Sequence, residues 1–401
     1  MTTLISFLGK GINGGGYKPA CYQFADGSTD TQPFFGLALA KHLGVERLLL
    51  VGTAGSCWDV FFGREESQNN DDLLTLIEAV EHNAVTHDRL QQFEKPIAAR
   101  LGLAVECVLI GYARTDAEQV ELLQQLAHRL EPQEHVVMDV THSFRHLPML
   151  ALVAARYLRF TRAVVVDDIY YGALEMTPPP PQRTLTPVLK LSGMLSMLDW
   201  VDALASFKKD GDYGVFADLL HAAGLSDGDS EILRTAAFME RVNFMQGARE
   251  RLDQPLKAVA QLTDPMVTLF REPLEKNLAW RREGSRGERE LALAKTWLAR
   301  GDYLRSAIFL QEGLITAEVL RPLAGNPDEF QQRNEARQAL HDELPDFRKL
   351  EKLRNALAHG QRPDDKTVSK VLGDEQELFK HLEKLTKNLP VALQKRHAAK
   401  T

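Results

Sequence analysis

The chain has few cysteines and no long uninterrupted apolar run. Its 401 residues include three cysteines, Cys21, Cys57 and Cys107, whose wide spacing gives neither a disulfide framework nor a paired set of metal ligands. Such sparse use of cysteine is typical of the reducing cytoplasm. The longest apolar stretch, 147–160, is interrupted by two arginines, and segment 4–8 is too short for an export signal. We therefore expect a cytoplasmic protein that does not enter a membrane.

An excess of positive charge is also missing. The formal net charge is −7, from 48 basic and 55 acidic residues. This balance argues against a broad surface that coats nucleic acid, and it leaves room for a local basic cleft. The charged and hydrophobic fractions, 26% and 44%, are ordinary for a globular protein. A chain of this length is expected to form two or three domains.

The two halves of the sequence differ in periodicity. In the first half, short apolar runs alternate with helical patterns, which favours a doubly wound, Rossmann-like domain with a mostly parallel sheet. The expected strands are Leu4–Leu8, Arg47–Val51, Val105–Ile110, Val136–Val140 and Ala163–Val166. The expected helices are Pro33–His42, Asp71–Ala84, Leu90–Leu101, Asp116–Arg129 and Leu147–Arg159. Beyond Pro187 the pattern is almost wholly helical. The predicted fold class is thus α/β plus all-α, with an α/β domain over 1–189, a helical linker over 190–225 and a helical domain over 226–401.

Small, polar and basic residues follow four of the expected strands. Because ligands of open α/β sheets bind at the carboxyl ends of the strands, these loops predict a binding site. Glycine backbone N–H groups, hydroxyls and basic side chains suit an anionic ligand, and aromatic rings could stack on a base. The candidate ligand-binding residues are Gly9, Lys10, Gly11, Thr53, Ser56, Trp58, Thr141, His142, Ser143, Phe144 and Arg145.

Several familiar motifs do not explain these loops. Residues 9–14 match G-x-G-x-x-G, but the segment after Gly16 is typical of a hairpin and the next strand ends without an acidic residue, so a dinucleotide site is rejected. A Walker phosphate loop is absent, and Ser56 does not lie in a G-x-S-x-G elbow. His142 and His146 are four residues apart, but no third ligand accompanies them. No metal site is predicted.

A second candidate site lies near the C-terminus, in Arg354-Asn355-Ala356-Leu357-Ala358-His359-Gly360. A guanidinium holds a phosphodiester and an imidazole moves protons near neutral pH. These groups suffice for metal-free RNA cleavage by the RNA's own 2′-hydroxyl. Five residues advance about 500° around a helix, so Arg354 and His359 project about 140° apart and would converge most readily at a dimer interface. Asn355 could orient one of them or bind the backbone. The competing interpretation is that Arg354 pairs with an acid such as Glu351 while His359 caps the helix.

The motifs of the first half resemble the CARF domain of CRISPR-associated ancillary ribonucleases. The resemblance rests on the 8–11 loop, on Tyr17 and Tyr22, on 51–58, and on Asp139-x-Thr141-His142-Ser143-Phe144-Arg145. The family motif has glycine where this chain has Ser143. The second half resembles the HEPN domain, through Arg354-Asn355-x-x-x-His359 and the segment 301–320. The resemblance covers nearly the whole chain.

This resemblance implies a sensor of cyclic oligoadenylates in type III CRISPR antiviral defence. The implied activity is a metal-independent endoribonuclease for single-stranded RNA, with Arg354, His359 and Asn355 as the catalytic residues. The implied activator is cyclic tetra-adenylate, with cyclic hexa-adenylate as the alternative, bound across a homodimer. No other cofactor and no DNA partner are expected. Two further interpretations stay open: a ring nuclease that degrades the messenger with Lys10, Ser56 and Arg145, and a non-catalytic CARF–HEPN binding module.

Overall fold

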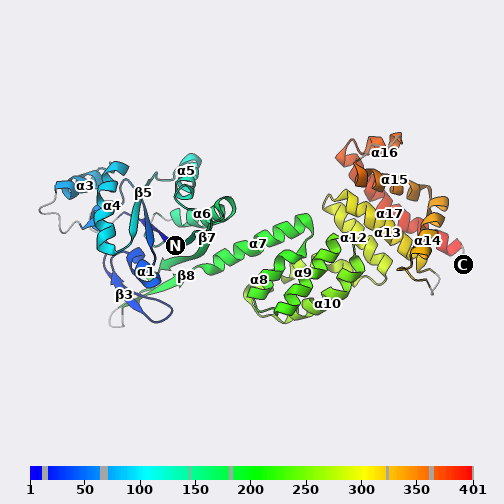
Figure 1. Cartoon of the computed structure of the whole chain (residues 1–401), viewed down its shortest axis with the longest axis horizontal. Helices are drawn as coiled ribbons and strands as arrows, with labels where there is room; N and C mark the ends of the chain where they lie inside the picture. The colour runs from blue at the N-terminus through cyan, green and yellow to red at the C-terminus, as the bar shows by residue number, and fades with distance from the viewer. Residues whose placement is uncertain are drawn as a thin grey trace. The chain divides into compact units, whose positions relative to one another are not determined.

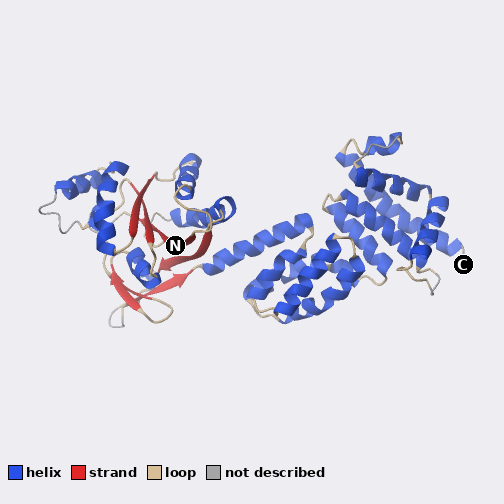
Figure 2. Ribbon diagram, viewed as in Figure 1, coloured by secondary structure: helices blue, strands red, loops and turns tan. Residues whose placement is uncertain are grey.

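The computed structural model describes residues 1–10, 17–63, 71–142, 144, 146–179, 184–321, 325–360 and 365–399. It divides the chain into two compact units, Met1–Ser196 and Met197–Thr401. The first unit contains all the described strands, and the described part of the second is helical (Figures 1 and 2). The predicted combination of an α/β half and an all-α half is therefore confirmed in outline.

The sheet of the first unit has the strand order β3-β2-β8-β7-β6-β1-β4-β5 in the described chain. Its strands are β1 (Thr2–Leu8), β2 (Ala20–Gln23), β3 (Thr29–Gln32), β4 (Arg47–Thr53), β5 (Ala104–Ile110), β6 (His135–Asp139), β7 (Val165–Gly172) and β8 (Leu185–Lys190). Strands β7, β6, β1, β4 and β5 are parallel to their neighbours within this group. From β1 the chain continues to β4 and β5 on one side of β1, and then to β6 and β7 on its other side. The strand order therefore reverses at β1.

Helices cover both faces of this parallel group, which explains its continuous apolar strands. On one face, Leu4 of β1 belongs to a core with α1 (Phe35–Leu43), α2 (Trp58–Phe62), α3 (Asp71–Glu81) and α4 (His87–Leu101). On the other, Ile5 belongs to a core with α5 (Asp116–Ala127) and α6 (Leu147–Arg162). Both Leu4 and Ile5 are fully buried, as expected for a strand enclosed on its two faces.

The far side of the sheet departs from the prediction. Strands β2 and β3 form the expected antiparallel hairpin, and β2 then pairs in parallel with β8, which runs antiparallel to β7. Strand β8 was not predicted, because Pro187 lies inside it, after a run of prolines. The carbonyl of Pro187 still accepts a hydrogen bond from the N–H of Ala173, so the strand tolerates the missing donor. The sheet is accordingly mixed, although mostly parallel.

The second unit is built from α7 (Ser192–Asp210), which begins in the first unit, a 3-10 turn η4 (Tyr213–Phe216), α8 (Ala217–Ala222), α9 (Asp227–Arg241), α10 (Met245–Gln261), α11 (Pro265–Asn277), a 3-10 turn η5 (Ala279–Arg282), α12 (Arg286–Ala299), α13 (Tyr303–Val319), α14 (Phe330–Glu343), α15 (Pro345–His359), α16 (Lys366–Val371) and α17 (Glu375–Ala399). Trp200, Phe207 and Phe216, from the predicted linker, lie in the same apolar core as the later helices. Helices α12 and α13 approach closely at two glycines, where a Cβ on Gly287 would lie 3.1 Å from the carbonyl oxygen of Gly313. No helix in the described ranges is long and apolar enough to cross a membrane.

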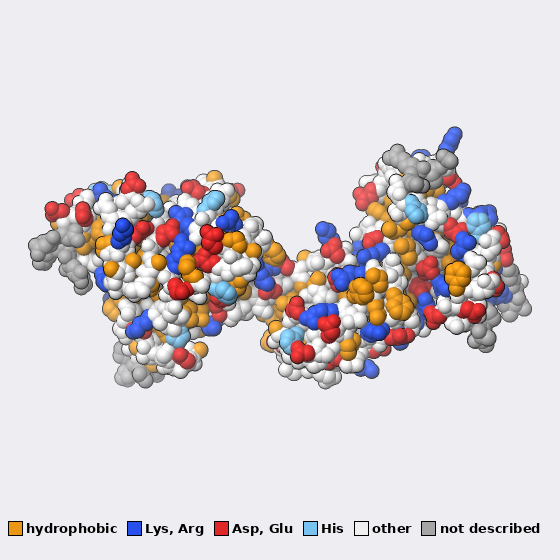
Figure 3. All heavy atoms as spheres, in the orientation of Figure 1, with side chains coloured by type: hydrophobic (Ala, Val, Ile, Leu, Met, Phe, Trp, Pro, Cys, Tyr) orange, Lys and Arg blue, Asp and Glu red, His pale blue; other side chains and the backbone are white. Residues whose placement is uncertain are grey.

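Charged side chains of both signs are interspersed on one face of each unit. On the face drawn in Figure 3, Lys and Arg side chains lie among Asp and Glu side chains in both units. Such mixing is expected from the small excess of acidic residues in the composition. Any anion that this face attracts must therefore be held by a few local cations.

Candidate functional site

The first candidate site, here called the strand-end site, lies where β1, β4 and β6 end. Gly9 follows β1 and lies against the loop that follows β6. A Cβ at Gly9 would meet the Tyr17 hydroxyl at 2.5 Å and the carbonyl oxygen of His142 at 3.3 Å. The position therefore requires glycine, since a side chain there would separate the two loops. The carbonyl of Gly9 also accepts the backbone N–H of Cys57 at 3.0 Å, which joins the loop after β4 to the same point.

In the loop after β4, the candidate polar groups are used inside the protein. Ser56 Oγ donates to the carbonyl of Leu8 at 2.6 Å and accepts the N–H of Thr53 at 2.9 Å. Trp58 Nε1 donates to the carbonyl of Thr53 at 2.8 Å. Thr53, Ser56 and Trp58 are at most 2% exposed. Their side chains fix the shape of the loop, and neither the Ser56 hydroxyl nor the Trp58 ring is presented to a ligand in this structure.

The loop after β6 is fixed by a buried carboxylate that was not among the predicted site residues. Asp139 is fully buried, accepts the Ser6 hydroxyl at 2.7 Å and accepts the N–H of Thr141 at 2.8 Å. Burial raises the pKa of Asp139 to about 6, while these hydrogen bonds act in the opposite direction. Thr141 Oγ1 accepts the N–H of Gly172, so the loop is also bound to β7. The Asp-x-Thr spacing in the sequence was the signal for this arrangement.

His142 connects this loop to α1. Its Nε2 accepts the backbone N–H of Phe35 at 3.2 Å, and its ring stacks on Tyr17 with centroids 4.0 Å apart. Burial lowers the pKa of His142 to about 4, so the ring is neutral at pH 7. His142 is 4% exposed. It is therefore a structural contact between the strand-end loops, α1 and Tyr17.

Two predicted residues have side chains nearer the solvent. Lys10 is exposed, and the half-buried ring of Phe144 lies 5.9 Å from the ring of Tyr112. The guanidinium of Arg114 lies 4.7 Å from the centre of the same tyrosine ring. This combination of cations and aromatic rings suits an anionic ligand that carries bases. The predicted residues Gly11, Ser143 and Arg145 lie outside the described residues.

The second candidate site, here called the α15 motif, consists of Arg354, Asn355 and His359. Helix α15 has Pro345 in its first turn and stops at Gly360, whose φ of 63° is left-handed. Asn355 and His359 are exposed and Arg354 is half-buried. Arg354 Nη1 donates to Asn355 Oδ1 at 2.9 Å, while its buried Nε has no hydrogen-bond partner among the described residues. The guanidinium thus keeps most of its donors for a ligand.

The competing interpretation of Arg354 as the partner of Glu351 is wrong. The carboxylate of Glu351 accepts from Arg337 Nη1 at 2.7 Å and contacts His341 Nδ1 at 2.5 Å, which ties α15 to α14. Among the described residues, Arg354 has no acidic partner and the ring of His359 has no hydrogen bond. Arg333, considered as part of an RNA path, is instead bound to Glu312 and to the carbonyl of Pro327.

Arg354 and His359 lie on one uninterrupted helix. No hydrogen bond or ring contact joins them in the part of the chain that the structure describes, in agreement with their expected divergence around the helix. Within the same ranges, no group of three His, Cys, Asp or Glu side chains is arranged to hold a metal ion. The chemistry available at the α15 motif is therefore phosphate binding by Arg354 and proton transfer by His359, from different sides of the helix end.

Comparisons with known proteins agree with the fold of the first unit. Residues 3–175 match the family described as "CRISPR system endoribonuclease Csx1, CARF domain", which is less than half of the chain. The chain is also similar to the CRISPR-associated protein MJ1674 of Methanocaldococcus jannaschii, with 23% identity over 421 aligned residues, which cover 93% of this chain. It spans 63% of that relative's length.

Together with the mostly parallel sheet, these similarities support a CARF-containing ancillary protein of type III CRISPR defence. A CARF domain implies the sensing of cyclic oligoadenylates. The family match ends at residue 175, before the helical unit, so the HEPN resemblance rests on the α15 motif and its surroundings alone.

Proposed function

We propose that the protein is a cyclic oligoadenylate-activated, metal-independent endoribonuclease that cleaves single-stranded RNA. The first unit would bind the messenger at the strand-end site, and the second would cleave RNA at the α15 motif. The observation that carries the nuclease assignment is the state of Arg354. Its guanidinium is held by Asn355 and has no acidic partner in the described chain, and an exposed histidine ends the same helix.

An unpaired, half-buried guanidinium is costly unless something binds it. A buried donor without a partner loses its hydration, typically at about 1–3 kcal/mol. The nearest acid along the helix, Glu351, is already bound to Arg337 and His341. A phosphodiester would supply the missing acceptors to Arg354 in a bidentate arrangement. The site is thus complementary to an anion rather than to a neighbouring carboxylate.

The proposed reaction requires no group beyond the RNA and the protein. The 2′-hydroxyl oxygen attacks the adjacent phosphorus, a 2′,3′-cyclic phosphate forms, and the bond from phosphorus to the 5′-oxygen breaks. His359 gives a proton to the 5′-oxygen as it leaves, and the 2′-hydroxyl proton passes to water or to a second histidine. Arg354 binds the phosphate and stabilises its developing charge. Asn355 orients the guanidinium through its Oδ1.

A homodimer fits this mechanism. Arg354 and His359 diverge around α15, so a pair of α15 helices related by a two-fold axis would bring an arginine of one protomer toward a histidine of the other. A ring-shaped messenger with rotational symmetry is likewise complementary to two copies of the strand-end loops. Activation then follows if the messenger binds the active arrangement of the dimer more tightly than the resting one. We assign cyclic tetra-adenylate as the activator, with cyclic hexa-adenylate as the alternative.

The ring-nuclease alternative has weaker support from the geometry. Its candidate Ser56 is 1% exposed, and its hydroxyl is already bound to Leu8 and Thr53. A non-catalytic binding module keeps the strand-end site but gives no reason for the unpaired Arg354. We therefore favour the nuclease.

The test is cleavage of a fluorescent single-stranded RNA by the full chain in EDTA, with cyclic tri-, tetra- and hexa-adenylate added in turn. The His359→Ala variant is measured in parallel, with His221→Ala as the control because His221 lies elsewhere in the helical unit. We expect cleavage with cyclic tetra-adenylate only, retained in EDTA and in the control, and reduced at least about 100-fold in His359→Ala.

Cleavage that is unaffected by His359→Ala would exclude the α15 motif as its source. Loss of the messenger without RNA cleavage would favour the ring nuclease. Messenger binding without either reaction would favour the binding module.

A further inference from the structure

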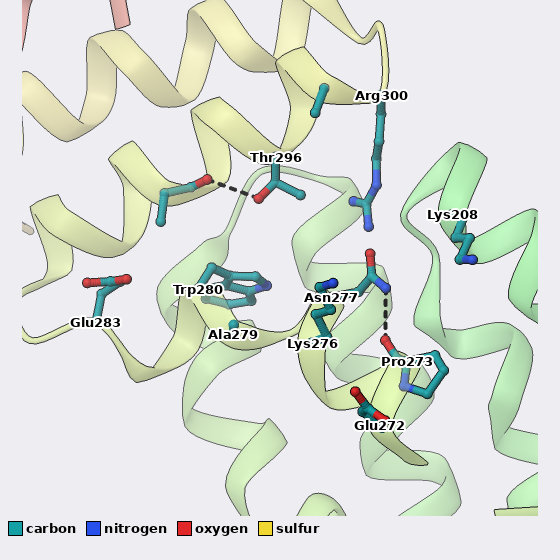
Figure 4. Close-up of a pocket in the computed structure, with 12 residues that line it drawn as sticks. Lys208, Glu272, Pro273, Lys276, Asn277, Ala279, Trp280, Glu283, Thr296 and Arg300 are labelled. Carbon is teal, nitrogen blue, oxygen red and sulfur yellow. Dashed lines mark hydrogen bonds between the residues drawn. The ribbon is translucent and has the colours of Figure 1, made fainter. Parts of the chain in front are cut away.

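The helical unit contains a cavity of about 720 Å³ whose residues the proposed nuclease does not use. It lies between the end of α7, α11, the turn η5 and the end of α12 (Figure 4). None of its lining residues belongs to α15. The polar and aromatic side chains that face it include Lys208, Lys276, Asn277, Trp280, Thr296 and Arg300. Its volume lies in the range of pockets that bind small molecules.

Arg300 is the central polar group of this cavity. In Figure 4 its side chain extends from the end of α12 into the pocket, toward Asn277. Its Nη2 is buried, and no described residue accepts a hydrogen bond from it or forms an ion pair with it. The guanidinium carbon lies 4.9 Å from the ring centre of Trp297 and 5.4 Å from that of Phe207. These ring faces stabilise the charge, but they do not accept the N–H groups in the guanidinium plane.

The side chains around Arg300 add positive charge, and a ligand would have to supply the hydrogen-bond acceptor for its guanidinium. Lys208 and Lys276 are exposed and have no ion-pair partner in the described chain. Asn277 Nδ2 is already used, because it donates to the carbonyl of Pro273 at 2.8 Å. Two carboxylates, Glu272 and Glu283, also line the cavity, on different sides of it in Figure 4. Three cations against two carboxylates leave a net charge of +1 among these lining side chains.

A buried carboxylate near Arg300 does not replace an external anion. Glu240 is 4% exposed, and no described ion pair joins it to Arg300. Burial raises the pKa of Glu240 to about 7, although the charges of Arg300 and Arg305 act in the opposite direction, so part of this group is protonated at neutral pH. The positive charge of Arg300 is therefore only partly offset from within the protein.

We propose that this cavity binds the phosphate group of a nucleotide, with Arg300 and Lys276 as its main phosphate contacts. Lys208 adds long-range attraction, and the apolar surface of Pro273, Ala279 and Ala299 faces the nucleoside. A guanidinium is suited to a phosphate, which accepts two parallel hydrogen bonds, and a small rotation of the Arg300 side chain would present its buried Nη2 as well. The phosphate can come from a free nucleotide or from a strand of RNA held away from the cleavage site. The second source rests on the proposed nuclease function.

The test is equilibrium binding to the full chain by titration calorimetry. The probes are inorganic phosphate, adenosine 5′-monophosphate, adenosine and a 2′-O-methyl RNA decamer that cannot be cleaved. The variants are Lys276→Ala and Arg300→Gln. Lys295→Ala is the matched control, because Lys295 is an exposed lysine of α12 outside the cavity.

We expect binding of the phosphate-bearing probes and none of adenosine to this cavity. Each of Lys276→Ala and Arg300→Gln should weaken binding about 10-fold, as expected for one charged hydrogen bond, and Lys295→Ala should leave it unchanged. If RNA is the source, the decamer binds more tightly than the mononucleotide. The slope of the logarithm of the RNA association constant against the logarithm of the salt concentration is then negative. Its magnitude decreases by about 0.7 for each phosphate that a variant no longer neutralises. If a free nucleotide is the source, the mononucleotide binds at least as tightly as the decamer.

The proposal fails if no phosphate-bearing probe binds, or if both cavity variants bind as the control does. Lys276→Ala keeps the test decisive if Arg300→Gln destabilises the core, since Lys276 is exposed. Adenosine monophosphate bound at the strand-end site would not respond to either variant. Binding is measured without cleavage, so a failure of the nuclease assignment would leave this result standing, and the reverse also holds.

Discussion

The two candidate sites use their polar side chains in opposite ways. At the strand-end site, Ser56 and His142 are buried, and their polar atoms are bonded to backbone groups of neighbouring elements. At the α15 motif, His359 is exposed, and within the described ranges Arg354 is bound by the adjacent Asn355 alone. A sheet edge where several loops meet needs polar groups to hold those loops together, whereas a helix satisfies its own backbone and leaves its side chains available. Buried motif residues of the strand-end site therefore hold its loops in place from inside the protein. The residues of the α15 motif instead lie at the surface, where a ligand can reach them.

The largest effect that sharpens this comparison is expected at Arg354. Arg354→Lys keeps the charge but loses the forked donors, so messenger-activated RNA cleavage should fall about 100- to 1,000-fold. The free energy of unfolding should change by less than about 0.5 kcal/mol, because no ion pair is removed. The measurements are single-turnover cleavage and urea unfolding, with Arg348→Lys on the same helix as the control. A variant that cleaves normally, or one that is strongly destabilised, would contradict the contrast between the two sites.

The next effect concerns the pH dependence of folding through His142. Its pKa in the folded protein, about 4, lies below that of the unfolded chain, so the unfolded chain binds the additional proton between pH 6.5 and 4. The contribution of His142 to stability is therefore complete above pH 6.5 and decreases as the pH falls toward 4, by about 3 kcal/mol in all.

His142→Gln removes this pH-dependent contribution. The stability difference between wild type and variant, measured by urea unfolding from pH 4 to pH 8, should shift against the wild type below pH 6.5. Asp139 titrates in the opposite sense, its ionisation reducing stability as the pH rises toward 6, but it is present in both proteins. His82→Gln, on an exposed residue, is the control. A flat difference for His142→Gln would mean that the ring is hydrated.

A smaller effect is expected at Ser56. Ser56→Ala leaves the N–H of Thr53 and the carbonyl of Leu8 without the partner that joins them, at a cost of about 1–3 kcal/mol in unfolding free energy. Binding of the cyclic oligoadenylate to the folded variant should weaken only slightly. Calorimetry at a temperature where the variant is folded separates the two effects. Unchanged stability with abolished binding would show that the hydroxyl contacts the ligand after all.

The smallest effect is expected at Lys10. Lys10→Ala removes an exposed cation beside the strand-end site, so messenger binding should weaken by about 3- to 10-fold, as expected for a partly screened charge contact. Stability should not change measurably. Lys95→Ala, on an exposed residue of α4, is the control and should bind as the wild type does. Equal binding by both variants would remove Lys10 from the site.

The sequence predicted β1, β4, β5 and β6 of the parallel group because their apolar runs depend only on local burial. The fifth expected strand, Ala163–Val166, was misplaced, because β7 runs over Val165–Gly172, where Asp167 and Asp168 interrupt the apolar pattern. The sequence did not predict β8, because the proline inside it argues against a strand, and the compensating contact with Ala173 comes from elsewhere in the chain. The hairpin was predicted from Tyr17–Phe24 alone, and it forms at β2 and β3.

At the sites, local sequence identified the right loops but not the orientation of their side chains. Whether the Ser56 hydroxyl turns toward Leu8 or toward a ligand depends on a strand 48 residues away in sequence. The pairing of Glu351 with Arg337 and His341 is also a tertiary contact, and nothing in the spacing of α15 indicates it. By contrast, the divergence of Arg354 and His359 follows from helix geometry, so it was predictable.

Gly360 determines how much of His359 an incoming molecule can reach. A residue in the middle of a helix has helical neighbours three and four positions away on both sides. His359 is the last residue of α15, so its neighbours within the helix lie in the preceding turn, at Asn355 and Ala356. Because left-handed backbone is easily adopted only by glycine, the helix ends at the same residue in every molecule. Replacing Gly360 by alanine would favour a longer helix and enclose the imidazole without altering any side chain of the motif. The position of His359 directly before Gly360 is thus as important to the motif as its spacing of five residues from Arg354.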